Sequence, residues 1–226
     1  MIRLDRLLAN LGYASRTEAN HMIRNGRVSV DGNVARDPSS RVDPGSVTLD
    51  DEPLDHPDGM LIALHKPAGY VCSHDDRDGA TVFTLLPRRW LDRTPRPEAV
   101  GRLDKDTTGL ILITDDHALL HRLTSPKHHV EKVYEVTLDR PVDPSLINVF
   151  AAGTLMLRSE SDPCLPARLC ILDDCRAELT ITEGRYHQVK RMFAACDYKV
   201  EALHRTHVGQ WSLDDIAAGE WRDLPQ

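Results

Sequence analysis

The chain has 226 residues, of which 41% are hydrophobic and 28% charged, and its formal net charge is −7. This length suits a small domain plus a medium one, and the composition is ordinary for a globular protein. No apolar run is long enough to span a bilayer, and the charged start of the chain lacks the features of a signal peptide. We therefore expect a cytoplasmic protein without membrane contact, and the negative charge argues against non-specific coating of nucleic acid.

Cysteine and histidine spacing gives no sign of a metal site. The five cysteines include no CxxC pair, which predicts reduced thiols rather than a disulfide framework. His117 and His121 are four residues apart, and two more histidines follow, but no cysteine lies beside them. We expect a solvated helix face there and no metal.

Charge is distributed unevenly along the first quarter of the chain. Residues 1–41 hold seven arginines and four acids, a local net charge of +3, whereas residues 42–58 hold six acids and no Lys or Arg. The first segment is therefore a candidate phosphate-facing surface.

The first 50 residues predict two short helices and a hairpin. Four leucines at helical spacing precede Gly12: Leu4, Leu7, Leu8 and Leu11. Ser15 and Glu18 form a capping-box pattern that begins a second helix, which ends at Gly26. Alternating valines then flank Asp31-Gly32, a pair typical of a type I′ hairpin.

This α-α-β arrangement, in RLDRLLANLGYASRTEANHMIRNGRVSVDGNVA, resembles the S4 RNA-binding domain over roughly residues 2–50. The resemblance rests on Ser15-Arg16, on Gly26 before a strand and on the Val-Asp-Gly turn. It implies that the paired helices present basic side chains to an RNA backbone. The arginines carried over as RNA contacts are Arg3, Arg16, Arg24 and Arg27. The alternative is that these arginines only keep the surface polar.

Residues 51–60 contain two prolines, four acids and no periodicity, which predicts a flexible linker. We accordingly expect a small domain at residues 1–55 and a larger one at residues 60–226. In the larger part, LIALH, GLILIT, VYEVTL, AELTIT and YKVEAL have the character of strands, and residues 115–123 and 187–196 of helices. Because strands and helices do not alternate, we expect an α+β fold with a mixed, mostly antiparallel sheet. Residues 158–175 are left unassigned.

The polar loop between Gly101 and Gly109, GRLDKDTTG, leads directly into the apolar strand LILIT. Loops that a rigid scaffold holds often carry catalytic groups. A tight turn capped by Asp104 or Asp106 is the structural alternative. The residues alone leave both interpretations open.

GRLDKDTTGLILITDD resembles the catalytic motif of pseudouridine synthases, specifically the branch with an N-terminal S4 domain. Three further blocks follow the family order: KPAGYVCS at 66–73, SPKHH with EKVY at 125–134, and EGRYHQVKRM at 183–192. With the S4 part, the resemblance spans nearly the whole chain. One departure is His117, where the family often has a turn glycine.

The resemblance assigns roles to individual residues. Asp104 matches the essential aspartate, and Arg102 matches the arginine that helps to hold the target nucleotide out of the stack. Tyr134 matches the tyrosine that packs on the flipped base and acts at the C5 proton step. Lys190 matches the basic residue that pairs with the aspartate. We also expect Arg185, in the basic segment 184–207, to contact the substrate.

The pattern of the residues is compatible with these roles. Tyr134 shares a strand face with Val136 and Leu138, so its ring can point inward. Lys190 lies beside the apolar face of its helix and can reach a cleft. The alternatives are a core tyrosine for Tyr134, a surface lysine for Lys190 and a structural ion-pair partner for Arg102.

The implied reaction breaks the N1–C1′ bond of uridine, turns the uracil and joins C5 to C1′. No atom is gained or lost, so we expect no cofactor, and the sequence has neither GxGxxG nor a P-loop. A carboxylate suits the sugar centre. Whether Asp104 would attack C1′ or take a proton from C2′ stays open.

Within this branch, RLTSPKHHVEKVYEVTL, GYVCSHDD and EGRYHQVKRMFAA most resemble the members that act on small-subunit (16S) ribosomal RNA. The resemblance implies 16S rRNA as the partner, with uridine 516 as the expected target. We expect a monomer that acts on a small-subunit assembly intermediate, because a structured loop offers shape and unstacked bases. The alternatives are a pseudouridine synthase for 23S rRNA and a non-catalytic S4-type RNA-binding or ribosome-assembly protein. A glycoside hydrolase would need a second carboxylate, which nothing in the sequence singles out.

Overall fold

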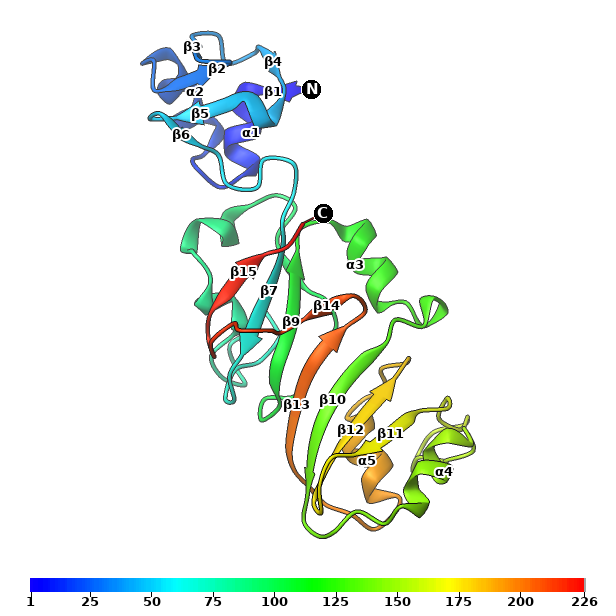
Figure 1. Cartoon of the computed structure of the whole chain (residues 1–226). Helices are drawn as coiled ribbons and strands as arrows, with labels where there is room; N and C mark the ends of the chain where they lie inside the picture. The colour runs from blue at the N-terminus through cyan, green and yellow to red at the C-terminus, as the bar shows by residue number, and fades with distance from the viewer. Residues whose placement is uncertain (226) are drawn as a thin grey trace.

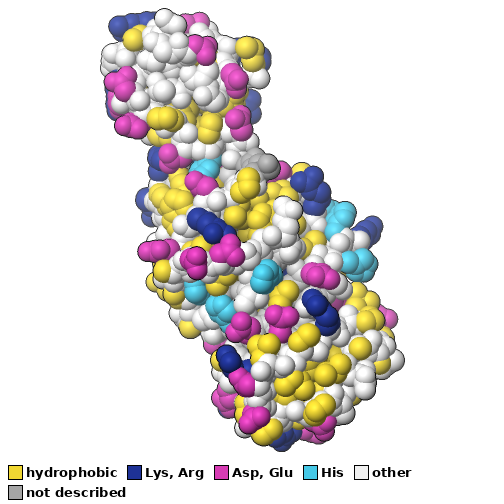
Figure 2. Space-filling view, in the orientation of Figure 1, with side chains coloured by type: hydrophobic (Ala, Val, Ile, Leu, Met, Phe, Trp, Pro, Cys, Tyr) yellow, Lys and Arg dark blue, Asp and Glu magenta, His cyan; other side chains and the backbone are white. Residues whose placement is uncertain are grey.

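The computed structural model describes residues 1–225, which form two parts separated by a narrow waist (Figure 1, Figure 2). The first part contains β1 (Ile2–Arg3), α1 (Leu4–Asn10), α2 (Arg16–Arg24), β2 (Val28–Val30), β3 (Asn33–Val34), β4 (Arg41–Val42), β5 (Val47–Leu49) and β6 (Glu52–Pro53). Its strands pair in the order β3-β2-β5-β6, with β1 and β4 as a separate pair.

Local signals explain the start of this first part. The Ser15 hydroxyl accepts a hydrogen bond from the Glu18 amide, and the Glu18 carboxylate accepts one from the Ser15 amide, so the predicted capping box begins α2. Asp31 and Gly32 both have positive φ, 48° and 75°, as a type I′ turn requires. The buried faces of both helices meet Val28 of the hairpin in one core. The two predicted helices and the hairpin are confirmed.

Residues 51–60 are not the free linker that their composition predicts. Glu52 and Pro53 form β6 against β5, and Leu54 is buried in the core of the first part. The Asp55 carboxylate accepts hydrogen bonds from Arg89 and Trp90 of the second part. These partners lie about 35 positions after Asp55 in the sequence, so no local pattern could predict the contacts.

The two parts also touch directly at the waist. Gly12 has φ of +76°, and a Cβ there would lie 2.4 Å from the Arg89 carbonyl oxygen. The Thr94 amide donates a 2.7 Å hydrogen bond to the Asn10 carbonyl, and the Arg89 guanidinium lies 4.0 Å from the ring centroid of Tyr13. Glycine at position 12 therefore permits the close approach of the first part.

The second part is built on one large sheet. Its strands are β7 (Leu61–Lys66), β8 (Glu98–Ala99), β9 (Thr108–Thr114), β10 (Lys132–Leu138), β11 (Arg168–Ile171), β12 (Arg176–Ile181), β13 (Val200–Val208), β14 (Trp211–Ser212) and β15 (Trp221–Asp223). Its helices are α3 (His117–Thr124), α4 (Ser145–Ala151) and α5 (Gln188–Ala194). The main order is β11-β12-β10-β13-β9-β7-β15, with β14 on β13 and β8 on β9.

Strand direction in this sheet confirms the predicted α+β class. Neighbouring strands run antiparallel except β13 and β9, which are parallel. The unassigned segment contributes β11, and α4 was not predicted. None of the helices in residues 1–225 is both long and apolar enough to cross a membrane.

The parallel junction depends on Gly109. Its φ is +109°, and a Cβ would lie 2.2 Å from the carbonyl oxygen of Arg205 on β13. Any side chain would therefore push β9 away from β13. The glycine thus brings the preceding loop, residues 101–107, against β13.

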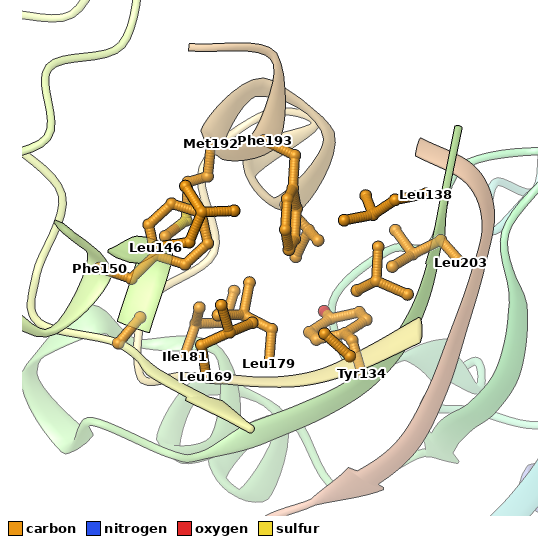
Figure 3. Close-up of a cluster of buried hydrophobic side chains, with 14 of the residues drawn as sticks. Tyr134, Leu138, Leu146, Phe150, Leu169, Leu179, Ile181, Met192, Phe193 and Leu203 are labelled. Atoms are coloured by element: carbon orange, nitrogen blue, oxygen red, sulfur yellow. The ribbon is translucent and has the colours of Figure 1, made fainter. Parts of the chain in front are cut away.

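The core beside this junction lies under α5. Figure 3 shows Met192 and Phe193 of α5 pointing toward Leu179 and Ile181 of β12, with Tyr134 of β10 on the same side of the sheet. Phe150 of α4 meets Phe193 edge to face, with ring centroids 5.1 Å apart. This packing fixes the start of α5 next to β10.

Candidate active site

A cavity of about 560 Å³ opens where the 101–107 loop, β10, β13 and the β12–α5 connection meet. Its lining includes Asp104, Tyr134 and His187. Side chains far apart in the sequence thus share one concave site, the usual setting for binding and chemistry.

Lys66 binds the backbone of the loop that carries Asp104. This lysine, at the end of β7, is fully buried, and its Nζ donates hydrogen bonds to the carbonyls of Thr107 (2.6 Å), Lys105 (3.2 Å) and Pro67 (3.2 Å). The Gly69 amide also donates to Lys105 O, at 2.8 Å. Burial lowers the pKa of Lys66. The KPAG block therefore supports the aspartate loop through hydrogen bonds to its backbone carbonyls.

Asp104 is held by two side chains from the start of α5. Lys190 Nζ lies 3.1 Å from its Oδ2, and His187 Nε2 lies 3.2 Å from its Oδ1. His187 has φ of 47° at the N-cap of α5, a left-handed conformation that aims its ring at the loop. Each carboxylate oxygen thus has its own partner, and the Asp104 side chain keeps 23% exposure toward the cavity.

Lys190 also reaches Asp106, with Nζ 2.6 Å from Oδ1. Burial alone would lower the pKa of Lys190, but hydrogen bonds to Asp106 and Asp104 outweigh it and raise that pKa. The hydrogen bond from Lys190 in turn lowers the pKa of Asp106. Lys190 is therefore a cation at neutral pH, tied to both acids of the loop.

Tyr134 stands on the buried face of β10 with Val136 and Leu138, as the strand pattern predicts. Only 7% of it is exposed, and it lines the cavity. Its hydroxyl accepts a 3.4 Å hydrogen bond from Arg205 Nη1, and the guanidinium carbon of Arg205 lies 5.9 Å from the ring centroid. The structure thus brings Asp104 and Tyr134 to one cavity, and Lys190 contacts Asp104 from outside the cavity lining.

Arg102 and Arg185, the other predicted substrate contacts of the second part, differ in their protein partners. Arg102 is exposed at the cavity and makes no side-chain hydrogen bond or ion pair within residues 1–225. Arg185 also lines the cavity, but its guanidinium donates to Glu183 (3.0 Å), Asp162 O (2.6 Å) and Pro163 O (2.5 Å). Arg102 is free to meet a ligand, whereas Arg185 holds a neighbouring loop.

The four arginines predicted to bind RNA lie in the first part, outside the cavity lining. Arg3 and Arg16 both bind the buried Asp5, and the Arg3 hydrogen bond lowers the pKa of that carboxyl. Arg27 pairs with the exposed Asp50. Arg24 is exposed, and its side chain has no carboxylate partner in the described chain. Three of the four are therefore ion-paired in the absence of RNA.

Sequence interpretation gave no individual role to four residues of the site. His187 stands in the EGRYHQVKRM block, Lys132 in EKVY and Lys66 in KPAG, so all three lay inside recognised motifs. Arg205 lay in the basic segment 184–207 without any motif. The contacts of Lys66, His187 and Arg205 join partners more than 35 positions away, which motif spacing does not reveal.

The histidines that were weighed as zinc ligands do not form a cluster. His117 and His121 are on α3 and are exposed to solvent. Within residues 1–225, no group of three or more His, Cys, Asp or Glu side chains is arranged to hold a metal ion.

The arrangement is suited to chemistry at a sugar. A carboxylate fixed between two donors faces a cavity that also holds a nearly buried aromatic ring. The carboxylate can approach an electron-poor sugar carbon, and the ring can pack on a planar base. A target base must leave its helical stack to reach such a cavity.

Known proteins are similar to this chain over nearly its whole length. Residues 60–195 match the family model described as RNA pseudouridylate synthase, and residues 2–47 match the S4 domain. Ribosomal small subunit pseudouridine synthase A of Pasteurella multocida (strain Pm70) is 45% identical over 226 residues, covering 99% of this chain and 96% of the relative. The protein of that name from Escherichia coli (strain K12) is 45% identical over 230 residues, covering 100% and 97%.

Similarity extends to solved structures. A crystal structure of a pseudouridylate synthase has 40% sequence identity and a TM-score of 0.69, and the match covers 100% of this chain and 96% of that one. The similarity in sequence and in fold therefore extends across both parts of the molecule.

Proposed function

Because this chain belongs to the RNA pseudouridylate synthase family and carries an S4 domain, we propose that it isomerises one uridine of small-subunit ribosomal RNA to pseudouridine. The observation that carries this proposal is the placement of Asp104 in the cavity, between Lys190 and His187 and together with Tyr134. The names of the full-length relatives support the choice of RNA.

In this proposal Asp104 is the catalytic carboxylate. The N1–C1′ bond breaks, its electron pair leaves with the uracil, and the Asp104 carboxylate either bonds to C1′ or takes a proton from C2′. The ring then turns and C5 joins C1′, while the C1′ bond to Asp104 breaks or the proton returns to C2′. The proton on C5 is then removed by a base. Lys190 and His187 each bind one oxygen of Asp104 and so limit the rotation of its carboxylate.

Tyr134 and Arg102 would act on the flipped nucleotide. The ring of Tyr134 would pack on the uracil, and its hydroxyl would act at the C5 proton step. Arg102 has no protein partner in residues 1–225 and stands at the cavity, so it can occupy the space that the extruded nucleotide leaves. Arg185 would contact the RNA only if it gave up part of its bonding to the 162–163 loop.

RNA affinity would come mainly from the first part. Arg3, Arg16, Arg24 and Arg27 would neutralise phosphates, Arg24 without first losing a partner. We further propose uridine 516 as the target, a cytoplasmic location, and a monomer that acts on a small-subunit assembly intermediate. A partly assembled particle would present the target loop in a defined shape.

The test is pseudouridine mapping after incubation with unmodified small- and large-subunit rRNA, each as naked RNA and as partly assembled particles. The proposal expects a single new pseudouridine in the small-subunit RNA, at uridine 516, and a faster reaction on the particles. A new pseudouridine only in 23S rRNA would keep the chemistry and overturn the target. No pseudouridine in any of the four substrates would favour the S4-type binding protein.

A further inference from the structure

Two cationic side chains share the inner wall of the cavity. Lys132 is two positions from Tyr134 on β10, so both side chains project from one face of the strand. Arg205 on β13 lies directly opposite Tyr134 in the sheet. All three line the cavity, on strands rather than on the loop that carries Asp104.

Within residues 1–225, neither cation has a counter-ion. Lys132 Nζ donates only to the carbonyl of Val130, at 2.9 Å. Arg205 Nε donates to Leu110 O at 2.8 Å and Nη1 to the Tyr134 hydroxyl, while the buried Nη2 has no partner within residues 1–225. The wall therefore carries two positive charges with no carboxylate bound to either side chain.

The acids of the cavity do not compensate these charges. Asp104 is bound by Lys190 and His187, and Glu183 is bound by Arg185 and Gln188. The charged or titratable side chains that share the lining with Lys132 are Cys72, Asp78, Arg102, Asp104, Tyr134, Glu183, Arg185, Tyr186, His187 and Arg205. Asp78 is exposed, and within residues 1–225 its carboxylate makes no ion pair with Lys132 or Arg205. Net positive charge therefore remains on the β10–β13 wall.

Such a wall is unfavourable without a ligand. Buried cations are normally paired, because removal from water is costly and like charges repel. Burial, aided by repulsion from Arg205, lowers the pKa of Lys132 to about 8. This direction is expected for a cation without a counter-ion, and at neutral pH the ammonium form still predominates. An anionic ligand would relieve both costs.

The depth of the wall indicates which anion fits. Arg205 is 2% exposed and Tyr134 7% exposed, so the site lies well inside the protein. The phosphodiester chain of an RNA has to pass in and out of the cavity and therefore stays near its opening. The flipped base is the part that reaches the inner wall. When N1–C1′ breaks, the bonding electron pair stays with the ring and its charge spreads to the two carbonyl oxygens.

We propose that Lys132 and Arg205 form a binding site for the uracil anion, donating hydrogen bonds to its carbonyl oxygens after the glycosidic bond breaks. This inference rests on the proposed function. The site stabilises the departing charge and keeps the free ring in the cavity while C5 turns toward C1′. When the C5–C1′ bond forms, the electron pair returns to the sugar and the C5 proton leaves to a base.

The first test measures single-turnover pseudouridine formation at saturating RNA together with the Kd for that RNA. Lys132→Met removes the charge, Lys132→Arg keeps it, and Lys199→Met removes an exposed lysine elsewhere. Lys132→Met should lower the rate by about 10²-fold, the usual effect of losing one donor to a developing anion, with Kd unchanged within about twofold. Lys132→Arg should recover most of the rate, and Lys199→Met should match the wild type.

A pH profile of the same reaction separates an electrostatic role of Lys132 from a packing role, because a packing role would not change the pH dependence of the rate. The wild-type rate should fall as pH rises through about 8, because the Lys132 ammonium then loses its proton. Lys132→Arg should keep its rate above that pH, since guanidinium does not titrate there. Equal profiles for the two proteins would contradict the site.

A binding measurement without turnover separates this inference from the proposed function. Barbiturate is a pyrimidine anion at neutral pH, and uracil is its neutral counterpart. Wild-type protein should bind barbiturate at least about tenfold more tightly than uracil, and Lys132→Met should lose this preference. No preference in the wild type would overturn the anion site even if rRNA is modified. Preference without any pseudouridine in rRNA would retain the site and remove the proposed reaction.

Two further outcomes would overturn the assignment of the ligand. Lys132→Met with the wild-type rate would make Lys132 a structural residue. Lys132→Met with a raised Kd and an unchanged saturated rate would place an RNA phosphate, not the uracil anion, at the wall. Equal thermal unfolding of the variants and the wild type would exclude misfolding as the cause of a rate loss.

Discussion

Two ion pairs of the molecule differ in their exposure to solvent. One joins Arg27 to Asp50 in the S4 part, and the other joins Lys190 to Asp104 at the cavity. Arg27 and Asp50 are 47% and 50% exposed, whereas Lys190 and Asp104 are 27% and 23% exposed. An exposed pair contributes little to stability, so a phosphate can replace Asp50 easily. Lys190 has a second acid to hold, and Asp104 a second partner. The first setting suits exchangeable RNA binding, and the second suits fixed geometry during a reaction.

Among the substitutions that distinguish the exposed pair from the partly buried pair, Lys190→Met should have the largest effect on the reaction rate. It removes the partner of one Asp104 oxygen and leaves Asp106 unpaired. We expect the saturated single-turnover rate to fall about 10²-fold with Kd for RNA within about threefold, because the loss is in positioning and electrostatics. Quenched-flow or hand-quenched mapping of pseudouridine at saturating enzyme measures it.

The matched control is Asp106→Asn, which removes the other partner of Lys190 while Asp104 keeps its own contacts. Asp106 is largely exposed, so this variant should lose less than about tenfold in rate. An Asp106→Asn defect as large as that of Lys190→Met would mean that Asp106, not Asp104, is the carboxylate that matters.

Arg24→Ala should weaken RNA binding and leave the saturated rate intact. Its side chain has no protein partner in residues 1–225, so its loss removes only an RNA contact. We expect Kd to rise about 3- to 10-fold and the slope of log K against log salt to fall by about 0.7 to 0.9. Filter binding at several salt concentrations measures both quantities.

Arg176→Ala is the control for that series, since it removes an exposed, ion-paired arginine from the second part. It should leave Kd and the salt slope unchanged. An equal effect of Arg176→Ala and Arg24→Ala would show that affinity follows net charge rather than the S4 surface.

Ser15→Ala should have the smallest functional effect. It deletes the capping box of α2 and should lower the free energy of unfolding by about 1 kcal/mol, without changing the saturated rate. Denaturant unfolding compares it with Thr17→Ala, an exposed neighbour on the same turn. A rate loss without a stability loss would assign Ser15 to RNA contact instead.

Local chemistry explains which features the sequence predicted. The capping box at Ser15, the Asp31-Gly32 turn and the Tyr134 strand face depend on neighbours within a few positions, and all three are confirmed. The family blocks also pointed to Asp104 and Tyr134, which line one cavity, and to Lys190, which binds Asp104.

The missed features depend on distant partners. Residues 51–60 have the composition of a linker, but Asp55 is fixed by Arg89 and Trp90. The parallel pairing of β9 with β13 rests on Gly109, whose role is visible only beside Arg205. His187 stood in a recognised motif, and its contact with Asp104 depends on how α5 packs. Periodicity carries no information on such contacts.

The measurement that tests the central claim most directly compares wild-type protein with Asp104→Asn on the same unmodified small-subunit rRNA. The substitution keeps the shape of the side chain and removes its charge. The account predicts one new pseudouridine with the wild type, none with Asp104→Asn, at least about a 10³-fold difference in rate, and equal Kd values. Full activity of Asp104→Asn would contradict the catalytic role of this carboxylate and leave the loop as a turn.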